Sequence, residues 1–180
     1  MVVPAGRRIV VMRPEKLSPF RLGLGIAPVV SQSGDLASGS RTTGAFGFDF
    51  GFSASEYVRH HLGIAHEWET HDGRGRKGFR IDLIALGFPI VVLARQVQIH
   101  VEPKLRVARG EILFSTEGDG QTDFRIASGF GLALTLAVRG WFLSFEPLSA
   151  DFRYFSATKD ASRTGFATLW WLETVLGREF

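Results

Sequence analysis

Large apolar residues alternate with small or charged residues over positions 123–139, the most regular stretch of the chain. A period of two predicts a β-strand with two unlike faces. At 17 residues this strand is about three times the usual length. Its apolar face carries Phe124, Ile126, Phe130, Leu132, Leu134, Leu136 and Val138, with Ser128 as the one small polar member, whereas Asp123, Arg125, Arg139, glycines, alanines and a threonine form the other face.

Such a strand fits two kinds of protein. In a soluble sandwich or barrel the apolar face would point into the protein. In a transmembrane barrel it would contact lipid, and the small and charged residues would fill a narrow lumen.

Seven further segments alternate in the same way, so the sequence predicts eight strands. The pattern shifts phase at Pro147, where we expect a bulge, and is lost near 85–89. Pro103 lies inside an alternating segment and predicts a bulge or kink there. Residues 169–176 also fit an amphipathic helix. The other seven segments are about 20–30, 45–52, 56–70, 78–84, 95–109, 141–154 and 164–180.

Long polar links alternate with short ones between these strands. The polar links are 31–40, 70–76, 115–121 and 157–163. Short turns at one end of a barrel and longer loops at the other are typical of outer-membrane barrels. We therefore expect an N-terminal extension over residues 1–18 and a β-barrel over residues 19–180.

The eight alternating segments, the asymmetry of the links and the final Phe180 resemble the small eight-stranded outer-membrane β-barrel family of the OmpA/OmpX type. The resemblance implies an all-β, eight-stranded antiparallel up-and-down transmembrane barrel in the outer membrane, in contact with lipid and lipopolysaccharide. It also implies that Phe180 is a recognition signal for the outer-membrane assembly machinery. Leu172 and Leu176 match the apolar positions of that signal, but Thr174 and Arg178 depart from it.

Aromatic residues lie near the predicted strand ends and form two sets, as interfacial anchoring predicts. One set is Phe20, Phe52, Tyr57, Phe88, Trp141 and Phe180, and the other is Trp68, Phe79, Phe114, Phe124 and Phe166.

The composition narrows the classes of function. No run approaches the roughly 18 apolar residues of a membrane helix, and the absence of cysteine excludes disulfides and thiolate chemistry. The net charge is +3 without a basic cluster, so we expect no nucleic-acid partner. The N-terminus lacks the core of a signal peptide, which argues against export unless the sequence is a processed form with an added Met1.

The polar faces of the predicted strands assign a set of residues to the lumen. We expect them to form a network of paired charges that fills the barrel, with a narrow, porin-like ion path or a ligand cavity as the alternative. The network residues are Arg59, His61, Glu67, Arg80, Asp82, His100, Glu102, Lys104, Arg106, Asp123, Arg125 and Glu146. The same polar faces also assign Arg21, Asp49, Gln96, Gln98, Asp151 and Arg153 to the lumen. The residues expected to face lipid are Phe46, Phe48, Phe50, Val97, Ile99, Phe130, Leu132, Leu134 and Leu136.

Two alternatives remain open at this point. His100, Ser144 and Glu146 are candidates for a nucleophile and base of a lipid A-modifying enzyme, although the local His-x-Ser pattern of such deacylases is missing. A soluble, lipocalin-like carrier would turn the apolar faces inward around a ligand. No metal ligands at a suitable spacing are present, so we expect neither a metal nor a cofactor.

The sequence favours a non-enzymatic cell-envelope protein: a membrane anchor, an envelope-integrity protein or a surface protein that binds partners through its four polar links. It does not indicate an oligomeric state.

Overall fold

The chain forms nine β-strands in the part that the structure describes. The computed structural model describes residues 18–34, 41–71, 74–94, 97–117, 122–157 and 162–180. No helix in these ranges is long and apolar enough to cross a membrane. The strands are β1 (Phe20–Gly34), β2 (Arg41–Ser53), β3 (Arg59–His71), β4 (Arg74–Gly87), β5 (Ile90–Ala94), β6 (Val97–Ser115), β7 (Thr122–Val138), β8 (Trp141–Ala157) and β9 (Ser162–Glu179).

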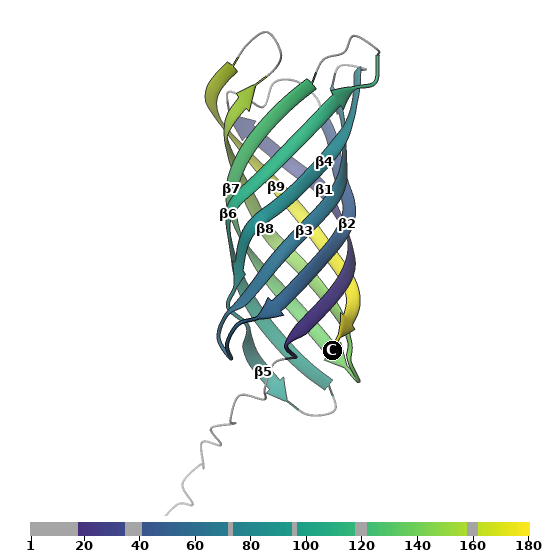
Figure 1. Cartoon of the computed structure of the whole chain (residues 1–180), viewed down its shortest axis with the longest axis vertical. Coiled ribbons are helices and arrows are strands. Elements are labelled where there is room, and N and C mark those ends of the chain that lie inside the picture. The colour runs from purple at the N-terminus through teal and green to yellow at the C-terminus, as the bar shows by residue number, and fades with distance from the viewer. Residues whose placement is uncertain (1–17, 35–40, 72–73, 95–96, 118–121, 158–161) are drawn as a thin grey trace, which may run out of the picture.

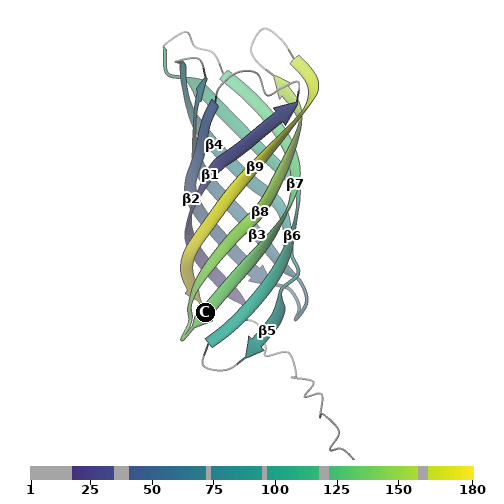
Figure 2. The ribbon, with the colours of Figure 1, turned by 180° about the vertical axis from the view of Figure 1, so that it is seen from behind.

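The strands close into a barrel with eight positions around its wall (Figures 1 and 2). Each strand pairs antiparallel with its neighbours, and β1 pairs with β9 to close the sheet. The short β5 takes no position of its own, because β4 and β5 pair one after the other with β6. The prediction of an eight-stranded antiparallel up-and-down barrel is therefore confirmed.

The strands β1 and β9 bring the first and last described residues together. The backbone N–H of Phe180 donates a hydrogen bond to the carbonyl oxygen of Phe20 over 2.9 Å. We call this the lower end of the barrel, as it is drawn in Figure 1. The short link at residues 54–58 and the turn at Arg139–Gly140 also lie there, whereas β1 and β2 are joined at the upper end.

The apolar faces point outward and the polar faces point inward. Phe48 and Leu134 are 58% and 45% exposed, whereas Arg106 and Arg125 are each 3% exposed. A closed antiparallel barrel separates alternate residues in this way, because successive side chains leave opposite faces of the sheet. The lipocalin-like arrangement, with apolar side chains inside and charges outside, is therefore wrong.

The bulge predicted at Pro147 is confirmed, because the pairing of β8 with β9 shifts register between Glu146 and Ser149. This shift moves the apolar set from odd to even positions. The segment at 169–176 is part of strand β9, so the helical alternative is wrong.

The bulge predicted at Pro103 is wrong, since the pairing of β6 with β7 runs through Pro103 and Leu132 without a shift. On its other side, the Pro103 carbonyl oxygen accepts the N–H of Phe88 over 2.9 Å. The nitrogen and oxygen of one strand residue point to the same side, so the missing N–H of Pro103 faces the gap between β4 and β5. No ladder bond is lost there, and the proline is tolerated.

Several strand ends differ from the predicted boundaries. β6 continues to Ser115 instead of ending at Arg109, and β4 begins at Arg74 instead of Gly78. These two extensions pair with each other, with Gly78 opposite Leu113. The residues near Arg74 and just after Arg109 have the polar, glycine-containing composition of a loop. They are nevertheless in strands, because pairing across the sheet overrides the local preference. β3 begins at Arg59 rather than Glu56 because residues 54–58 form the link, in which the N–H of Ala54 donates to the carbonyl of Val58.

The two predicted aromatic sets lie near opposite ends of the barrel. All of the lower residues are exposed: Phe20, Phe52, Tyr57, Phe88, Trp141 and Phe180. Among the upper residues, Trp68, Phe79, Phe114 and Phe124 are exposed, while the side chain of Phe166 lies outside the described part.

Candidate functional site

The lumen is the candidate site, because the polar face of nearly every strand converges there. Inward glycines and alanines on β1–β3 leave room for long charged side chains from the opposite wall, on β6–β8. The charged residues form three clusters, which we call lower, middle and upper according to the distance of their strand positions from the end that holds Phe20 and Phe180. A buried charge costs several kcal/mol unless it is paired, so the pairing in these clusters decides whether the lumen is stable.

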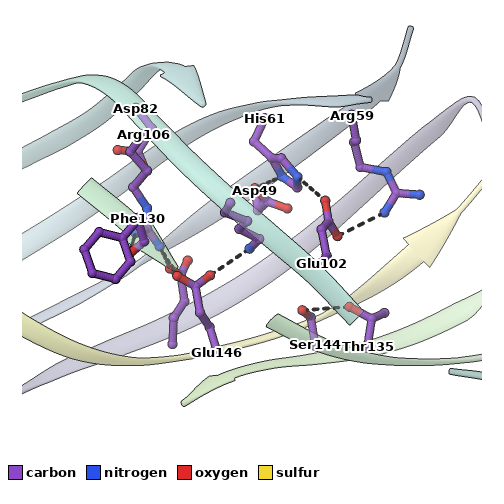
Figure 3. A network of polar contacts seen from close by, with 12 residues as sticks. Asp49, Arg59, His61, Asp82, Glu102, Arg106, Phe130, Thr135, Ser144 and Glu146 are labelled. Carbon is purple, nitrogen blue, oxygen red and sulfur yellow. Dashed lines mark hydrogen bonds and ion pairs between the residues drawn. The ribbon is translucent and has the colours of Figure 1, made fainter. Parts of the chain in front are cut away.

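The lower cluster is centred on Glu102 of β6 and contains Arg21, Asp49, Arg59 and His61. Glu102 is fully buried, and its two carboxylate oxygens lie 2.8 Å from His61 Nε2, 3.3 Å from Arg21 Nη1 and 3.5 Å from Arg59 Nη1. Asp49 on β2 lies 3.1 Å from His61 Nδ1 and 3.3 Å from Arg21 Nη2. Figure 3 shows Arg59 and His61 converging on Glu102 from β3. One carboxylate from β6 thus ties β1 and β3 together across the lumen.

The middle cluster is held by Arg106 and Arg109 of β6. Arg106 donates to Glu146 and lies 3.3 Å from Glu173 Oε2, while Lys104 Nζ lies 2.9 Å from the second oxygen of Glu146. Arg109 pairs with the carboxylates of two different strands. The cluster consists of Asp82, Lys104, Arg106, Arg109, Glu146, Asp151 and Glu173.

The upper cluster joins β3, β4, β6, β7 and β8. Arg125 Nη1 lies 2.6 Å from Glu69 Oε2, and its Nη2 lies 3.1 Å from Asp123 Oδ2. Arg153 Nη2 donates to Glu111 Oε2 over 2.6 Å. Arg76 also pairs with Asp123. These pairs connect Arg125 of β7 to Glu69 of β3, and Arg153 of β8 to Glu111 of β6, so they join strands that do not neighbour one another in the wall.

Trp171 lies in the lumen between the middle and upper clusters and is only 1% exposed. The guanidinium carbons of Arg80 and Arg109 lie 4.9 and 6.0 Å from its ring centroid. Trp171 also packs into an apolar cluster with Ala27, Ala45, Ala65, Ala167 and Leu169. The indole therefore occupies the lumen at this level together with Arg80 and Arg109, whose guanidinium groups stabilise the ring through cation–π contacts.

A small cavity of about 20 Å³ lies below this level. Its lining includes Gly25, Gly47 and Gly63 together with Asp49, Asp82 and Glu173. A single water molecule needs roughly this much space. The cavity therefore has no room for an organic ligand.

Glu67 stands apart from the three clusters. It is fully buried, and neither of its carboxylate oxygens has a hydrogen-bond partner among the described residues. It lies on β3 between Ala45 and Gly78 of the neighbouring strands.

The predicted network residues all point into the barrel. Of the twelve, only Asp82 is partly exposed, and the others are buried. Gln96, which was also assigned to the lumen, lies outside the described residues. Of the nine residues expected to face lipid, Phe46, Phe48, Phe50, Phe130, Leu134 and Leu136 are exposed outside the barrel, and Val97, Ile99 and Leu132 are half-buried on the same face.

The lumen also contains charges that the predicted set omits. Arg109 and Glu111 face inward because β6 shifts register between Arg106 and Arg109. The sequence carries a signal for this shift, since the outward apolar positions are odd up to Val107 and even from Ile112. Glu69, Glu173 and Trp171 are the other inward residues of note that are missing from the set.

The candidate enzyme residues do not form a catalytic set. Ser144 Oγ is 2.9 Å from Thr135 Oγ1, from which it accepts a hydrogen bond, and His100 Nε2 lies 3.1 Å from Gln98 Oε1 (Figure 3 shows the first contact). Glu146 is paired with Lys104 and Arg106 instead of a histidine. All three candidates are buried in the lumen, on the face opposite the acyl chains that such an enzyme would cleave. Within the described ranges, no group of three or more histidine or acidic side chains could hold a metal ion.

A crystal structure of Neisserial surface protein A has the same architecture. It superposes with a TM-score of 0.61 at 12% sequence identity, and the match covers 91% of this chain and 98% of that one. The fold is that of a small outer-membrane β-barrel.

The outer-membrane barrel fold is thus shared over nearly the whole length of both chains, while the sequences have diverged. No protein-family model matches the sequence, and no curated protein matches it as a relative. At 12% identity the likeness concerns the fold, and the roles of individual residues rest on the geometry described above.

Proposed function

We propose that this protein lies in an outer membrane as a barrel closed to ions, and that it presents its upper links to partners at the cell surface. The observation that carries the proposal is the arrangement of the wall. A mostly apolar exterior, with His60 and His66 as polar positions on β3 and aromatic residues at both ends, surrounds a lumen that contains paired charges and Trp171. Burying the exterior in hydrocarbon removes from water the apolar side chains that a soluble protein would not expose on this scale.

The proposed surface role rests on the upper links. The likeness to a protein that is named as a surface protein supports it. Part of each predicted link 31–40, 70–76, 115–121 and 157–163 lies outside the described residues, and most of the described remainder belongs to the ends of the flanking strands. The proposal therefore rests on the positions of these strand ends. The strands bring all four to the upper end, on a scaffold that the lumen clusters hold rigid. Lipid and lipopolysaccharide are the proposed surroundings of the wall.

Ion conductance tests the closed lumen. The protein is refolded into detergent and examined for a folded band that shifts on boiling, and then it is added to planar bilayers. We expect a shifting band and no stable conductance steps. A folded protein with steady open channels would contradict the closed lumen, and a protein that stays monomeric and folded in water without detergent would contradict the membrane location.

Epitope insertion tests the orientation. A short tag is placed between residues 119 and 120 in one variant and between Ser55 and Glu56 in a matched variant at the lower end. On intact cells, an antibody is expected to bind the first tag alone, and to bind both tags after lysis. Binding to the lower tag on intact cells would show that the proposed orientation is wrong.

The role of Phe180 as an assembly signal stays a proposal that its position supports. Phe180 is 64% exposed at the lower end of β9, where a membrane-bound assembly factor could contact it. F180A is expected to lower the amount of assembled barrel in cells while leaving refolding in detergent unchanged. F20A, which removes a neighbouring aromatic residue from the same end, serves as the control. Equal losses from both variants would show that Phe180 acts only as an anchor.

A further inference from the structure

Arg178 is a cation on the outer, apolar face of the barrel. It follows Leu176 and precedes Phe180 on the outward side of β9, and its partners across the neighbouring strands are Leu22 and Trp141. Its side chain is exposed, and its guanidinium carbon lies 5.8 Å from the ring centroids of both Trp141 and Phe180. The two aromatic rings therefore hold the guanidinium at the lower rim, with its donors free to face outward.

The guanidinium of Arg178 lacks the partners that the lumen arginines have. In the described part of the chain, no carboxylate lies within 4.0 Å of it, whereas Arg21, Arg106 and Arg125 each pair with at least two. The adjacent Glu179 does not compensate for it, because that side chain points inward and lies 3.7 Å from Arg59.

Arg139 is a second exposed cation at the lower end, in the turn that leads into Trp141. It occupies the turn between β7 and β8, two residues before Trp141, and its φ of 50° places it in the left-handed region that the turn requires. Its side chain is exposed, and none of the ion pairs between described residues involves it. Trp141 is thus flanked along the chain by Arg139 and across the sheet by Arg178.

We propose that Arg139 and Arg178 form a binding site for the phosphate of an anionic phospholipid at the lower rim of the barrel. Guanidinium groups bind phosphate oxygens through paired N–H donors, and indole rings favour the level of the headgroups. A lipid bound there places its acyl chains along the apolar wall formed by Leu22, Leu143 and Leu176. This proposal depends on the proposed membrane location, and it adds anionic phospholipids as a specific class of ligand.

Native mass spectrometry of the detergent-refolded barrel tests the site, with phosphatidylglycerol as the anionic probe and phosphatidylcholine as the zwitterionic one. The wild-type protein is expected to retain phosphatidylglycerol preferentially. R178Q and R139Q are each expected to weaken that retention roughly fivefold, the effect of one interfacial cation. R178K keeps the positive charge and is expected to keep most of the retention of phosphatidylglycerol.

K77Q is the matched control, because Lys77 is an exposed cation near the upper end and its loss changes the net charge equally. Weakening by K77Q as large as that by R178Q would show only general attraction to the barrel and would overturn the site. Heat-modifiable mobility confirms folding of each variant, and R139Q and R178K carry the test if R178Q does not fold. A barrel that needs detergent but shows no preference for phosphatidylglycerol would overturn this site and leave the membrane location standing.

Discussion

Arg109 on β6 pairs with Asp151 on β8 across the intervening strand β7. The Arg109 guanidinium donates through Nη1 to Asp151 Oδ2, and through Nη2 it reaches Asp82 Oδ2 on β4 at 2.9 Å. Both groups of the pair are buried. One side chain thus bridges three strands that do not all neighbour one another in the wall, which makes this pair a sensitive point for the stability of the barrel.

Removing the charge of Asp151 is expected to destabilise the barrel by about 3 kcal/mol, because it leaves part of a buried cation unpaired. The variant D151N is compared with the wild-type protein by urea unfolding in lipid vesicles. The double variant R109M/D151N removes the orphaned cation as well and is expected to lose less than the sum of its two single variants. Strict additivity would show that the two side chains do not stabilise each other.

Shortening Trp171 is expected to open the lumen. W171A removes the buried indole that lies in the lumen between the middle and upper clusters, and the lost packing also costs about 3–5 kcal/mol. Planar-bilayer recordings are expected to show ion currents that the wild-type protein lacks. The neighbouring Trp170 points outward and is 37% exposed, so W170A is the matched control and is expected to stay closed. A closed W171A barrel would show that the charged clusters seal the lumen by themselves.

Gly78 and Gly110 are expected to respond differently to a methyl group. A Cβ at Gly78 would overlap the backbone of Ile112 and Leu113 on β6, whereas a Cβ at Gly110 would meet no atom within 4 Å. G78A is therefore expected to cost about 1–3 kcal/mol of unfolding free energy through overpacking. G110A is expected to be neutral in the same urea titration. Equal stability of the two variants would contradict the close approach of β4 and β6.

A charge placed on the outer wall reports the depth of each position in the membrane. Phe48 lies midway along β2, opposite Leu24 and Ile64, and Phe52 lies at the lower end opposite Phe20. F48R is expected to lose about 2–4 kcal/mol, and F52R about 0–1 kcal/mol, because the cost of a charge falls toward the interface. Equal losses, measured by unfolding from vesicles, would contradict the proposed position of the apolar belt.

The alternation of apolar and polar residues predicts most of the fold, because in a barrel the two faces of each strand lie in the same two environments along its whole length. Phe48, Leu134 and Arg106 therefore lie on the predicted faces without any knowledge of their neighbours. Strand ends were less accessible to prediction. The upper part of β6 carries Arg109, Gly110 and Glu111, which look like loop until Asp82, Asp151, Arg125 and Arg153 supply partners from other strands.

The partners within the lumen could not be predicted, because they join strands distant in sequence. The pairing of Arg125 with Glu69 depends on which strands face each other across the closed barrel, and a linear pattern of charges holds no such information. The same is true of Trp171, whose inward direction follows from alternation but whose place between two guanidiniums does not.

Trp170 and Trp171 leave the same wall in opposite directions, so the chain carries two adjacent fluorophores in different surroundings. A quencher attached to an acyl chain meets the first indole, and the second is shielded from it by the thickness of the sheet. In a background in which Trp68 and Trp141 are replaced by phenylalanine, comparing fluorescence decay in W170F and W171F would therefore follow insertion of the wall and closure of the interior as two separate optical signals during refolding.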